Sequence, residues 1–309
     1  IMHSTISNNE CRGIELGDSS NNTIKNNRIS NNYWGGIYLW NSSKNVIASN
    51  DISNNGGSSD GSSWGVGIVL DVFSSNNVIT NNNISDDGAI GIELWASSNN
   101  IITNNIISNN ENGIDLPEHS SRNIITNNII SNNEMYGIWL QDSSNNVITN
   151  NSISNNGCSG IVLDGFSLTN RITNNTFIKD GIFIRCSYHN VIEGNTVNGK
   201  PLVYLEGETG VRIEDAGQVI LVKCSDIEVE NLNLSNTDIA MELWHSENCR
   251  VESNVISNNS CGIEFWYSSN NTITNNTISN NSCGAYLDDS SNNTITNNTI
   301  SNNGWSGIC

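Results

Sequence analysis

The sequence is poor in basic residues and contains no long hydrophobic run. Lysine and arginine account for 12 of the 309 residues, against 31 aspartates and glutamates, which gives a formal net charge of −19. Binding of nucleic-acid phosphates requires a basic surface, so we expect no nucleic-acid partner. A membrane-spanning helix requires about 20 predominantly apolar residues, and no stretch approaches that length. The acidic balance is typical of an extracellular or high-salt setting.

The sequence also lacks the residue patterns of a metal site. Its four histidines lie in separate regions, and none of its eight cysteines forms the Cys-x-x-Cys pairing of a zinc site. We therefore expect no metal and no cofactor.

What the chain does contain is one phrase that recurs along almost its whole length. The phrase is close to Gly-Ile-x-Leu-x-x-Ser-Ser-Asn-Asn-x-Ile-Thr-Asn-Asn-x-Ile-Ser-Asn-Asn. Its glycine returns at Gly13, Gly36, Gly67, Gly91, Gly113, Gly137, Gly160, Gly181, Gly262, Gly284 and Gly307. A spacing of roughly 22 residues is typical of a solenoid. Leucine-rich repeats share that period, but the dense leucine frame that they need is missing here.

Each repeat contains three short β-type segments separated by asparagine corners. In one repeat the segments are 262–266, 272–274 and 277–279. Asparagine tolerates left-handed backbone geometry, so Asn-Asn pairs predict tight corners. Alternation along each segment places isoleucine and leucine inside. We predict an all-β fold, a parallel β-helix (solenoid) of about thirteen coils with three short strands per coil.

The repeat predicts one domain over residues 1–309, because neighbouring coils share a continuous core. Residues 54–66, around Asp60 and Trp64, expand one turn into a projecting loop. Residues 198–238 replace the asparagine corners but still contain strand-like apolar runs. Both ends fall inside a repeat, so we expect a fragment of a longer chain, or ends that meet neighbouring subunits.

Chemistry is expected at the outward positions of the Gly-Ile-x-Leu segment, where carboxylates alternate with tryptophans. Exposed aromatic rings mark binding surfaces, and flat rings beside acids suit sugar faces and hydroxyls. We predict ligand binding by Trp40, Trp95, Trp139, Glu242, Trp244, Glu264 and Trp266. The alternative is that loops or a partner subunit cover these rings.

Two carboxylates on this face, Glu93 and Asp115, are the candidate catalytic pair. They lie on consecutive coils, where repulsion should raise the pKa of one partner. A separation of about 5 Å also suits the acid and nucleophile of a retaining glycosidase. Every column of a β-helix produces such neighbours, however, so a structural role is the competing interpretation.

Cys261 and Cys283 each precede the repeat glycine in consecutive coils. That register places their Cα atoms within reach of a disulfide. A cross-coil disulfide is one expectation, and a ladder of buried thiols is the other.

The corner and strand phrases cover nearly all of the chain and are joined by three further segments. These are 199–201 (Gly-Lys-Pro), 215–224 (Asp-Ala-Gly-Gln-Val-Ile-Leu-Val-Lys-Cys) and 229–236 (Val-Glu-Asn-Leu-Asn-Leu-Ser-Asn). Together they resemble right-handed parallel β-helix repeat proteins of the NosD-like group, also described as carbohydrate-binding and sugar-hydrolysis repeats. Such proteins are abundant on the surface of methanogenic archaea. The resemblance implies a right-handed coil, which is also the usual hand of parallel crossovers.

Two activities known among such repeats do not transfer to this sequence. There is no Met-rich or His-rich set for copper. The nearest basic candidates for a pectate-lyase-type site, Arg185 and Lys179, have no acidic calcium cluster beside them.

Three functional hypotheses remain. The first is an extracellular, cell-surface scaffold or adhesion module that binds a glycan or a neighbouring subunit through the Trp-acid face. The second is a polysaccharide hydrolase or lyase that uses carboxylates on the same face. The third is an end-to-end stacking filament or surface-layer subunit with homotypic contacts at open coil ends. The sequence leans away from an enzyme.

Overall fold

The structure is a computed structural model that describes residues 1–56 and 65–309. Its described part is built from parallel β-coils with three strands per coil, about thirteen turns in all, as the repeat predicts. The chain groups into two compact units. Unit 1 comprises residues 1–175 and 184–191, and unit 2 comprises residues 176–183 and 192–309. A single domain over the whole chain stays a prediction.

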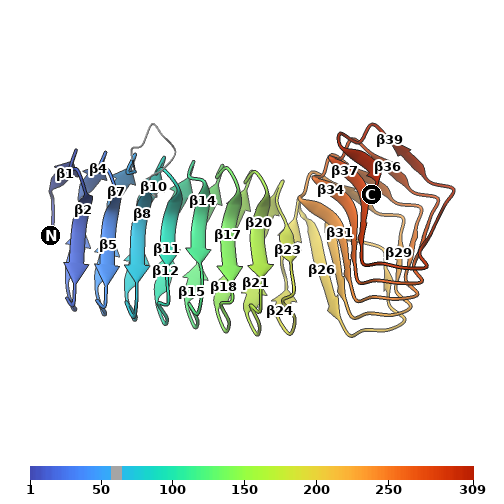
Figure 1. Cartoon of the computed structure of the whole chain (residues 1–309), viewed down its shortest axis with the longest axis horizontal. Coiled ribbons are helices and arrows are strands. Elements are labelled where there is room, and N and C mark those ends of the chain that lie inside the picture. The colour runs from blue at the N-terminus through green and yellow to red at the C-terminus, as the bar shows by residue number, and fades with distance from the viewer. Residues whose placement is uncertain (57–64) are drawn as a thin grey trace. The chain divides into compact units, whose positions relative to one another are not determined.

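Unit 1 contains three parallel sheets, one for each side of the coil (Figure 1). The first contains β1 (Thr5–Ser7), β4 (Arg28–Ser30), β7 (Asp51–Ser53), β10 (Asn83–Ser85), β13 (Ile106–Ser108), β16 (Ile129–Ser131) and β19 (Ser152–Ser154). The second contains β2 (Arg12–Gly17), β5 (Gly35–Trp40), β8 (Val66–Asp71), β11 (Ile90–Leu94), β14 (Asn112–Leu116), β17 (Tyr136–Gln141) and β20 (Ser159–Asp164). The third contains β3 (Thr23–Lys25), β6 (Val46–Ala48), β9 (Val78–Thr80), β12 (Ile101–Thr103), β15 (Ile124–Thr126), β18 (Val147–Thr149) and β21 (Arg171–Thr173).

Unit 2 repeats this arrangement. One sheet contains β22 (Thr176–Ile178), β25 (Thr196–Val197), β26 (Lys200–Glu206), β28 (Gln218–Val222), β31 (Ile239–Trp244), β34 (Cys261–Trp266), β37 (Cys283–Asp288) and β40 (Ser306–Ile308). The others contain β27 (Arg212–Ile213), β29 (Glu228–Glu230), β32 (Arg250–Glu252), β35 (Thr272–Thr274) and β38 (Thr294–Thr296), and β30 (Asn233–Ser235), β33 (Val255–Ser257), β36 (Thr277–Ser279) and β39 (Thr299–Ser301). Two strands, β23 (Ile182–Ile184) and β24 (Val191–Glu193), cross the boundary between the units.

The core is a stack of aliphatic ladders. Ile102 pairs in register with Ile125, and Ile125 with Ile148, and all three side chains are fully buried. Each inward position therefore buries an apolar side chain against its equivalent in the next coil, as the alternation predicts.

In each Asn-Asn corner the first asparagine forms the turn and the second bonds to the neighbouring coils. In the pair Asn127-Asn128 the first residue has a φ of 57°, which asparagine tolerates in a tight corner. The second is buried, and its backbone N–H and Nδ2 both donate to Oδ1 of Asn151, at 2.9 and 3.0 Å. Its Nδ2 also donates to the carbonyl of Ile102 in the preceding coil at 3.0 Å. The buried asparagines thus bond consecutive coils together.

The repeat glycine is required by close approach rather than by an unusual φ. A Cβ added to Gly113 would lie 2.5 Å from the carbonyl oxygen of Gly137 in the next coil. No side chain fits there, so the glycines form a column of their own along the coils.

The structure describes the two irregular segments, 54–66 and 198–238, to different extents. Gly56 and Gly65 lie side by side, since a Cβ on Gly56 would be 2.0 Å from the Cα of Gly65. Asp60 and Trp64, predicted to sit in a projecting loop, lie outside the described residues. The apolar runs within 198–238 do form strands, β26 and β28, with an antiparallel pairing of β25 with β26 before the parallel order resumes.

The two cysteines for which the register predicts a cross-coil disulfide or a thiol ladder are neighbours in the structure. Cys261 and Cys283 are in register on β34 and β37, as predicted, but both are free thiols. The Sγ atom of Cys283 instead lies 3.0 Å from Sγ of Cys309. Among the described residues no helix is long and apolar enough to cross a membrane.

Candidate functional site

The outer surface of the β2–β20 sheet in unit 1 is a grid of side-chain columns. In one column, register pairs Tyr38 with Val69, Val69 with Glu93, and Glu93 with Asp115. The column two residues further along places Trp40 beside Asp71. Side chains that are distant in the sequence therefore become neighbours at one coil spacing.

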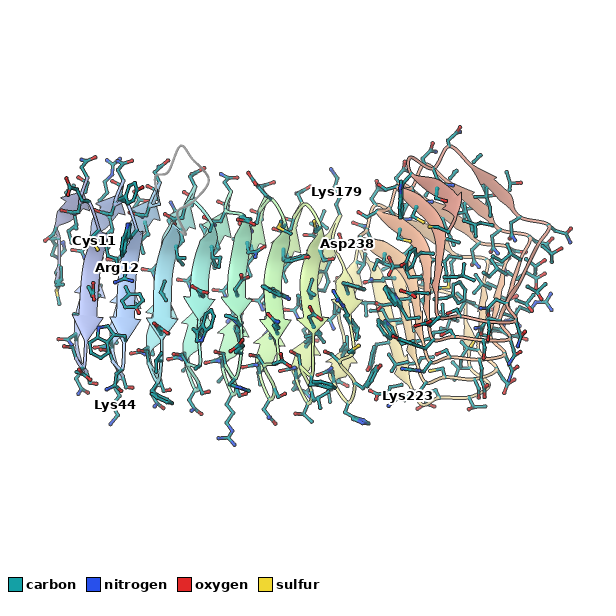
Figure 2. The ribbon with its side chains drawn as sticks, in the orientation of Figure 1. Cys11, Arg12, Lys44, Lys179, Lys223 and Asp238 are labelled. Atoms are coloured by element: carbon teal, nitrogen blue, oxygen red, sulfur yellow. The ribbon has the colours of Figure 1, made fainter. Side chains whose placement is uncertain are left out.

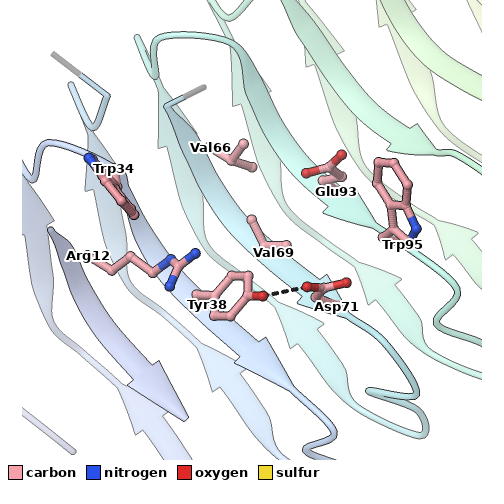
Figure 3. Close-up of a pocket in the computed structure, with 8 residues that line it drawn as sticks. All are labelled: Arg12, Trp34, Tyr38, Val66, Val69, Asp71, Glu93 and Trp95. Atoms are coloured by element: carbon pink, nitrogen blue, oxygen red, sulfur yellow. Dashed lines mark hydrogen bonds between the residues drawn. The ribbon is translucent and has the colours of Figure 1, made fainter. Parts of the chain in front are cut away.

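Part of this grid is hollowed. The hollow has a volume of about 390 Å³ and opens to solvent (Figure 3). Its lining combines three aromatic rings, two valines, one guanidinium and two carboxyls, from Arg12, Trp34, Tyr38, Val66, Val69, Asp71, Glu93 and Trp95. Figure 3 shows Arg12 and Trp34 at one end, Glu93 and Trp95 at the other, and Tyr38 and Val69 between them.

One end of the hollow is cationic. The guanidinium of Arg12 lies over the ring of Tyr38, 3.6 Å from its centroid, and its Nη1 is 3.1 Å from Oε2 of Glu15. Both contacts orient the side chain, which Figure 2 places on the first coils of unit 1. Trp34 stands beside it with 55% of its surface exposed.

The other end is acidic. Tyr38 donates its hydroxyl proton to Oδ2 of Asp71, while Oδ1 of Asp71 accepts the backbone N–H of Val72 at 2.8 Å. Burial and the hydrogen bond to Asp71 raise the pKa of Tyr38 to about 12, so this proton stays on the tyrosine at neutral pH. Both carboxyl oxygens of Asp71 therefore accept hydrogen bonds, which orient its side chain beside Tyr38.

Glu93 is the second carboxyl that lines the hollow. Burial, followed by the charge of Asp71, raises the pKa of Glu93 to about 7. The hollow thus contains a carboxyl, Glu93, that is partly protonated at neutral pH and can donate a hydrogen bond. Trp95 projects beside Glu93 and is 44% exposed. A ring, an acceptor and a donor converge on one space.

The predicted catalytic partner of Glu93, Asp115, is not available at the surface. It is in register with Glu93, as expected, but only 2% exposed. Its Oδ2 accepts Nδ2 of Asn112 at 3.0 Å, and it does not line the hollow. Burial raises the pKa of Asp115 to about 8, with the charge of Glu93 a smaller cause. The predicted charge repulsion gives the correct direction of the pKa shift of Asp115, but desolvation contributes more to that shift.

The other two predicted tryptophans of unit 1 stand outside the hollow. Trp40 is exposed in the column of Asp71 but does not line the hollow. Trp139 is half-buried, with its ring 6.1 Å from that of Tyr136.

In unit 2 the predicted surface is largely closed. Trp244 is 1% exposed and Glu242 is fully buried, so the expectation that they face solvent is wrong. The indole of Trp244 donates to Oε1 of Glu242 and stacks on Trp266, with 5.1 Å between ring centroids and 6° between planes. Trp266 and Glu264 are half-buried and repeat the bond, with Nε1 3.0 Å from Oε2. The two neighbouring indoles thus cover each other, and each donates a hydrogen bond to the glutamate of its own strand.

Of the eight residues that line the hollow, the sequence singled out only Glu93 and Trp95. Tyr38 and Asp71 were visible only as members of the outward columns, and Arg12 and Trp34 were not identified. The position of Arg12 in the repeat is a sequence signal that could have identified it. It directly precedes the repeat glycine, at an outward position whose equivalents at this strand of the sheet are Gly35 and Val66. Among the described residues no cluster of three His, Cys, Asp or Glu side chains could hold a metal ion.

Comparison with known families identifies the class of protein. The chain matches the family described as right handed beta helix region over residues 1–123, 62–197 and 118–224, and therefore belongs to it. This confirms the predicted fold and its right-handed coil. Residues 203–309 also match the family described as periplasmic copper-binding protein (NosD). No curated protein matches the sequence.

Solved structures with the same fold include carbohydrate-acting enzymes. The catalytic domain of a GH87 α-1,3-glucanase in complex with nigerose gives a TM-score of 0.54 at 18% identity, over 97% of this chain and 63% of the glucanase chain. The mannuronan C-5 epimerase A-module of Azotobacter vinelandii gives 0.47 at 13% identity, over 100% and 86% of the two chains. A periplasmic alginate epimerase gives 0.48 at 17% identity, over 94% and 73%. At these identities the likeness establishes the fold alone.

Proposed function

We propose that this chain is an extracellular or periplasmic β-helix module that binds a glycan in the hollow of unit 1. The observation that carries the proposal is the convergence of two exposed indoles, Trp34 and Trp95, with the acids Asp71 and Glu93 around one open space. Of the sugar-binding face predicted from the sequence, the proposal retains Trp95 and adds the hollow beside it as the binding site.

The chemistry of the hollow fits a sugar. An indole offers a flat apolar face for the C–H face of a pyranose ring, and Trp95 presents such a face beside Glu93. Asp71 can accept hydroxyl protons, and a protonated Glu93 can donate to a ring or hydroxyl oxygen. Val66 and Val69 give the floor an apolar surface.

The fold is compatible with this role. The glucanase domain that shares it was seen with nigerose, so a chain with this fold can bind a sugar. Which sugar this chain binds depends on its own hollow, since the likeness does not extend to the residues that line it.

The test is a glycan-binding screen with the whole chain, followed by titration of the best oligosaccharide. Trp95→Ala should weaken binding at least tenfold, because it removes the stacking platform. The matched control is Trp40→Ala, which removes an exposed indole outside the hollow and should leave affinity within twofold. Equal losses in the two variants, or no binding to any glycan, would contradict the proposal.

A hydrolase is the second candidate, and the pKa of Glu93 favours it. A carboxyl whose pKa is near 7 can serve as general acid, and a second carboxyl, that of Asp71, lines the same hollow. The pair Glu93 and Asp71 thus replaces the pair Glu93 and Asp115 expected from the sequence. If the hydrolase is correct, Glu93→Gln abolishes release of reducing sugar while binding persists. If the unmodified chain releases no reducing sugar from any glycan that it binds, the hydrolase is excluded and the glycan-binding module is the remaining candidate.

A further inference from the structure

A ladder of corner side chains runs through unit 1 and is interrupted by one aspartate. The ladder consists of the last corner residue before each repeat glycine strand. Its members are Asn9, Asn32, Asn55, Asp87, Asn110, Asn133 and Asn156.

In the regular rungs the amide donates in two directions. Nδ2 of Asn32 donates to Oδ1 of Asn55 at 2.9 Å and to the backbone carbonyl of Ile6 at 3.2 Å. Asn55 repeats the pattern, with Nδ2 bonded to Oδ1 of Asp87 at 2.9 Å and to the carbonyl of Ile29 at 3.2 Å. At these two rungs the Nδ2 atom therefore faces two acceptors.

Asp87 keeps the accepting half of this pattern. Its Oδ1 accepts the backbone N–H and the Nδ2 of Asn55, both at 2.9 Å, and its own N–H donates to Oδ1 of Asn110 at 3.0 Å. Its Oδ2 is buried without a hydrogen-bond partner among the described residues. An ionised Oδ2 has no hydrogen to offer where the other rungs present an amide hydrogen to an acceptor, and a buried unpaired charge is costly.

We infer that Asp87 is a carboxylic acid in the folded protein, and that its hydroxyl hydrogen donates to Oδ1 of Asn110 and completes the ladder. Oδ1 of Asn110 is a suitable acceptor, because at a regular rung Oδ1 of the next asparagine accepts both the backbone N–H and the Nδ2 of the preceding residue, as Asn55 does from Asn32.

The electrostatic surroundings agree with a protonated carboxyl. Burial raises the pKa of Asp87 to about 7, although the hydrogen bonds from Asn55 lower it. The charge of the adjacent, exposed Asp86 raises it further. Asn55, Asn110 and Gly67, which approach the carboxyl from the neighbouring corners and from β8, carry no charge.

The carboxyl lies against β8, the strand that carries Val66, Val69 and Asp71 of the hollow. A Cβ on Gly67 of β8 would be 2.5 Å from Oδ2 of Asp87. The residues that follow Asp87, Ala89 and Ile90, pack against Val66 and Val69, which line the hollow. Ionisation of Asp87 above neutral pH therefore acts first on β8 and β11, so the corner works as a proton-sensitive joint in the support of the hollow.

The test compares thermal unfolding of Asp87→Asn with its matched control Asp86→Asn between pH 4 and pH 9. Because the folded-state pKa is raised, the unmodified chain loses stability from this group as pH rises from about 4 to about 7. Asparagine supplies the missing donor at every pH. The gain in Tm from Asp87→Asn should therefore grow with pH and reach roughly 5 °C at pH 8, while Asp86→Asn changes Tm by less than about 1 °C.

Two results would overturn the inference. One is a gain that is constant across the pH range or equal in the two variants. The other is an Asp87→Asn chain that does not fold. Independently of any variant, the ¹³C shift of the Asp87 carboxyl in the unmodified chain should titrate near pH 7, whereas a titration near pH 4 would show an ionised rung.

Discussion

The same sequence phrase, Glu-x-Trp, gives an open surface in unit 1 and a closed one in unit 2. In unit 1, Glu93 and Trp95 border the hollow, and the neighbouring coil offers Val69 and Asp71 at the equivalent positions. In unit 2 the phrase occurs on two consecutive coils, so the indoles of Trp244 and Trp266 stack and each donates to its own glutamate. The identity of the adjacent coil therefore decides whether a Trp-acid pair can receive a ligand.

Removal of the buried indole tests the structural half of this comparison and should have the largest effect. Trp244→Ala should lower the free energy of unfolding by about 3–5 kcal/mol, the usual cost of deleting a fully buried large ring. Chemical denaturation of the chain measures this loss. Glycan affinity of the folded variant should stay unchanged, because Trp244 is in unit 2. A cost below about 1 kcal/mol would mean that the stacked indoles do not support unit 2.

The buried acid of unit 1 provides the next largest effect. Asp115→Asn keeps the shape of the side chain and the bond from Asn112 but removes a carboxyl whose pKa is raised to about 8. The raised pKa makes the unmodified chain lose stability between about pH 4 and pH 8, so the variant should be more stable by about 2–4 kcal/mol at pH 9 and nearly equal at pH 4. Denaturation at the two pH values measures the difference. Loss of sugar binding or release in this variant, with stability unchanged, would restore Asp115 as a functional residue.

The hydrogen bond inside the hollow can be compared with its equivalent in unit 2. Tyr38→Phe removes the donor to Asp71 and should cost about 1–2 kcal/mol of stability, because a half-buried carboxyl oxygen loses its hydrogen-bond partner. Tyr286→Phe is the control, since its hydroxyl donates to Asp288 at a longer 3.3 Å and its removal should cost clearly less than that of Tyr38. Equal costs by denaturation would remove the distinction between the two sites.

Protonation of Glu93 should have the smallest effect, visible only as pH dependence. In the unmodified chain, glycan affinity should fall a few-fold as pH rises from 6 to 8, because the donor is lost near pH 7. Glu93→Gln remains a donor throughout and should show a flat profile over that range. Titration calorimetry of both proteins measures the slopes. A slope that survives in the variant would assign the pH dependence to another group, such as Asp87.

The sequence carried most of the fold because the fold depends on repeated local chemistry. The glycine column, the Asn-Asn corners and the inward isoleucines each predict one feature of a coil, and each is present as expected. Burial on the outer face was less predictable. Trp95 and Trp244 occupy equivalent positions in the phrase, yet the exposure of each depends on the side chains of the neighbouring coil. The shape of the hollow depends in addition on Arg12 and Trp34. The order of strands can be predicted from one repeat. A binding site, by contrast, depends on different side chains at equivalent positions of neighbouring coils.

Hydroxyl-radical footprinting of the tryptophans, with and without the bound oligosaccharide, tests the glycan site most directly. The account predicts that the sugar protects Trp34 and Trp95 and leaves the oxidation of Trp266 unchanged. Protection of Trp266, or of neither Trp34 nor Trp95, by an oligosaccharide that binds the chain would contradict it.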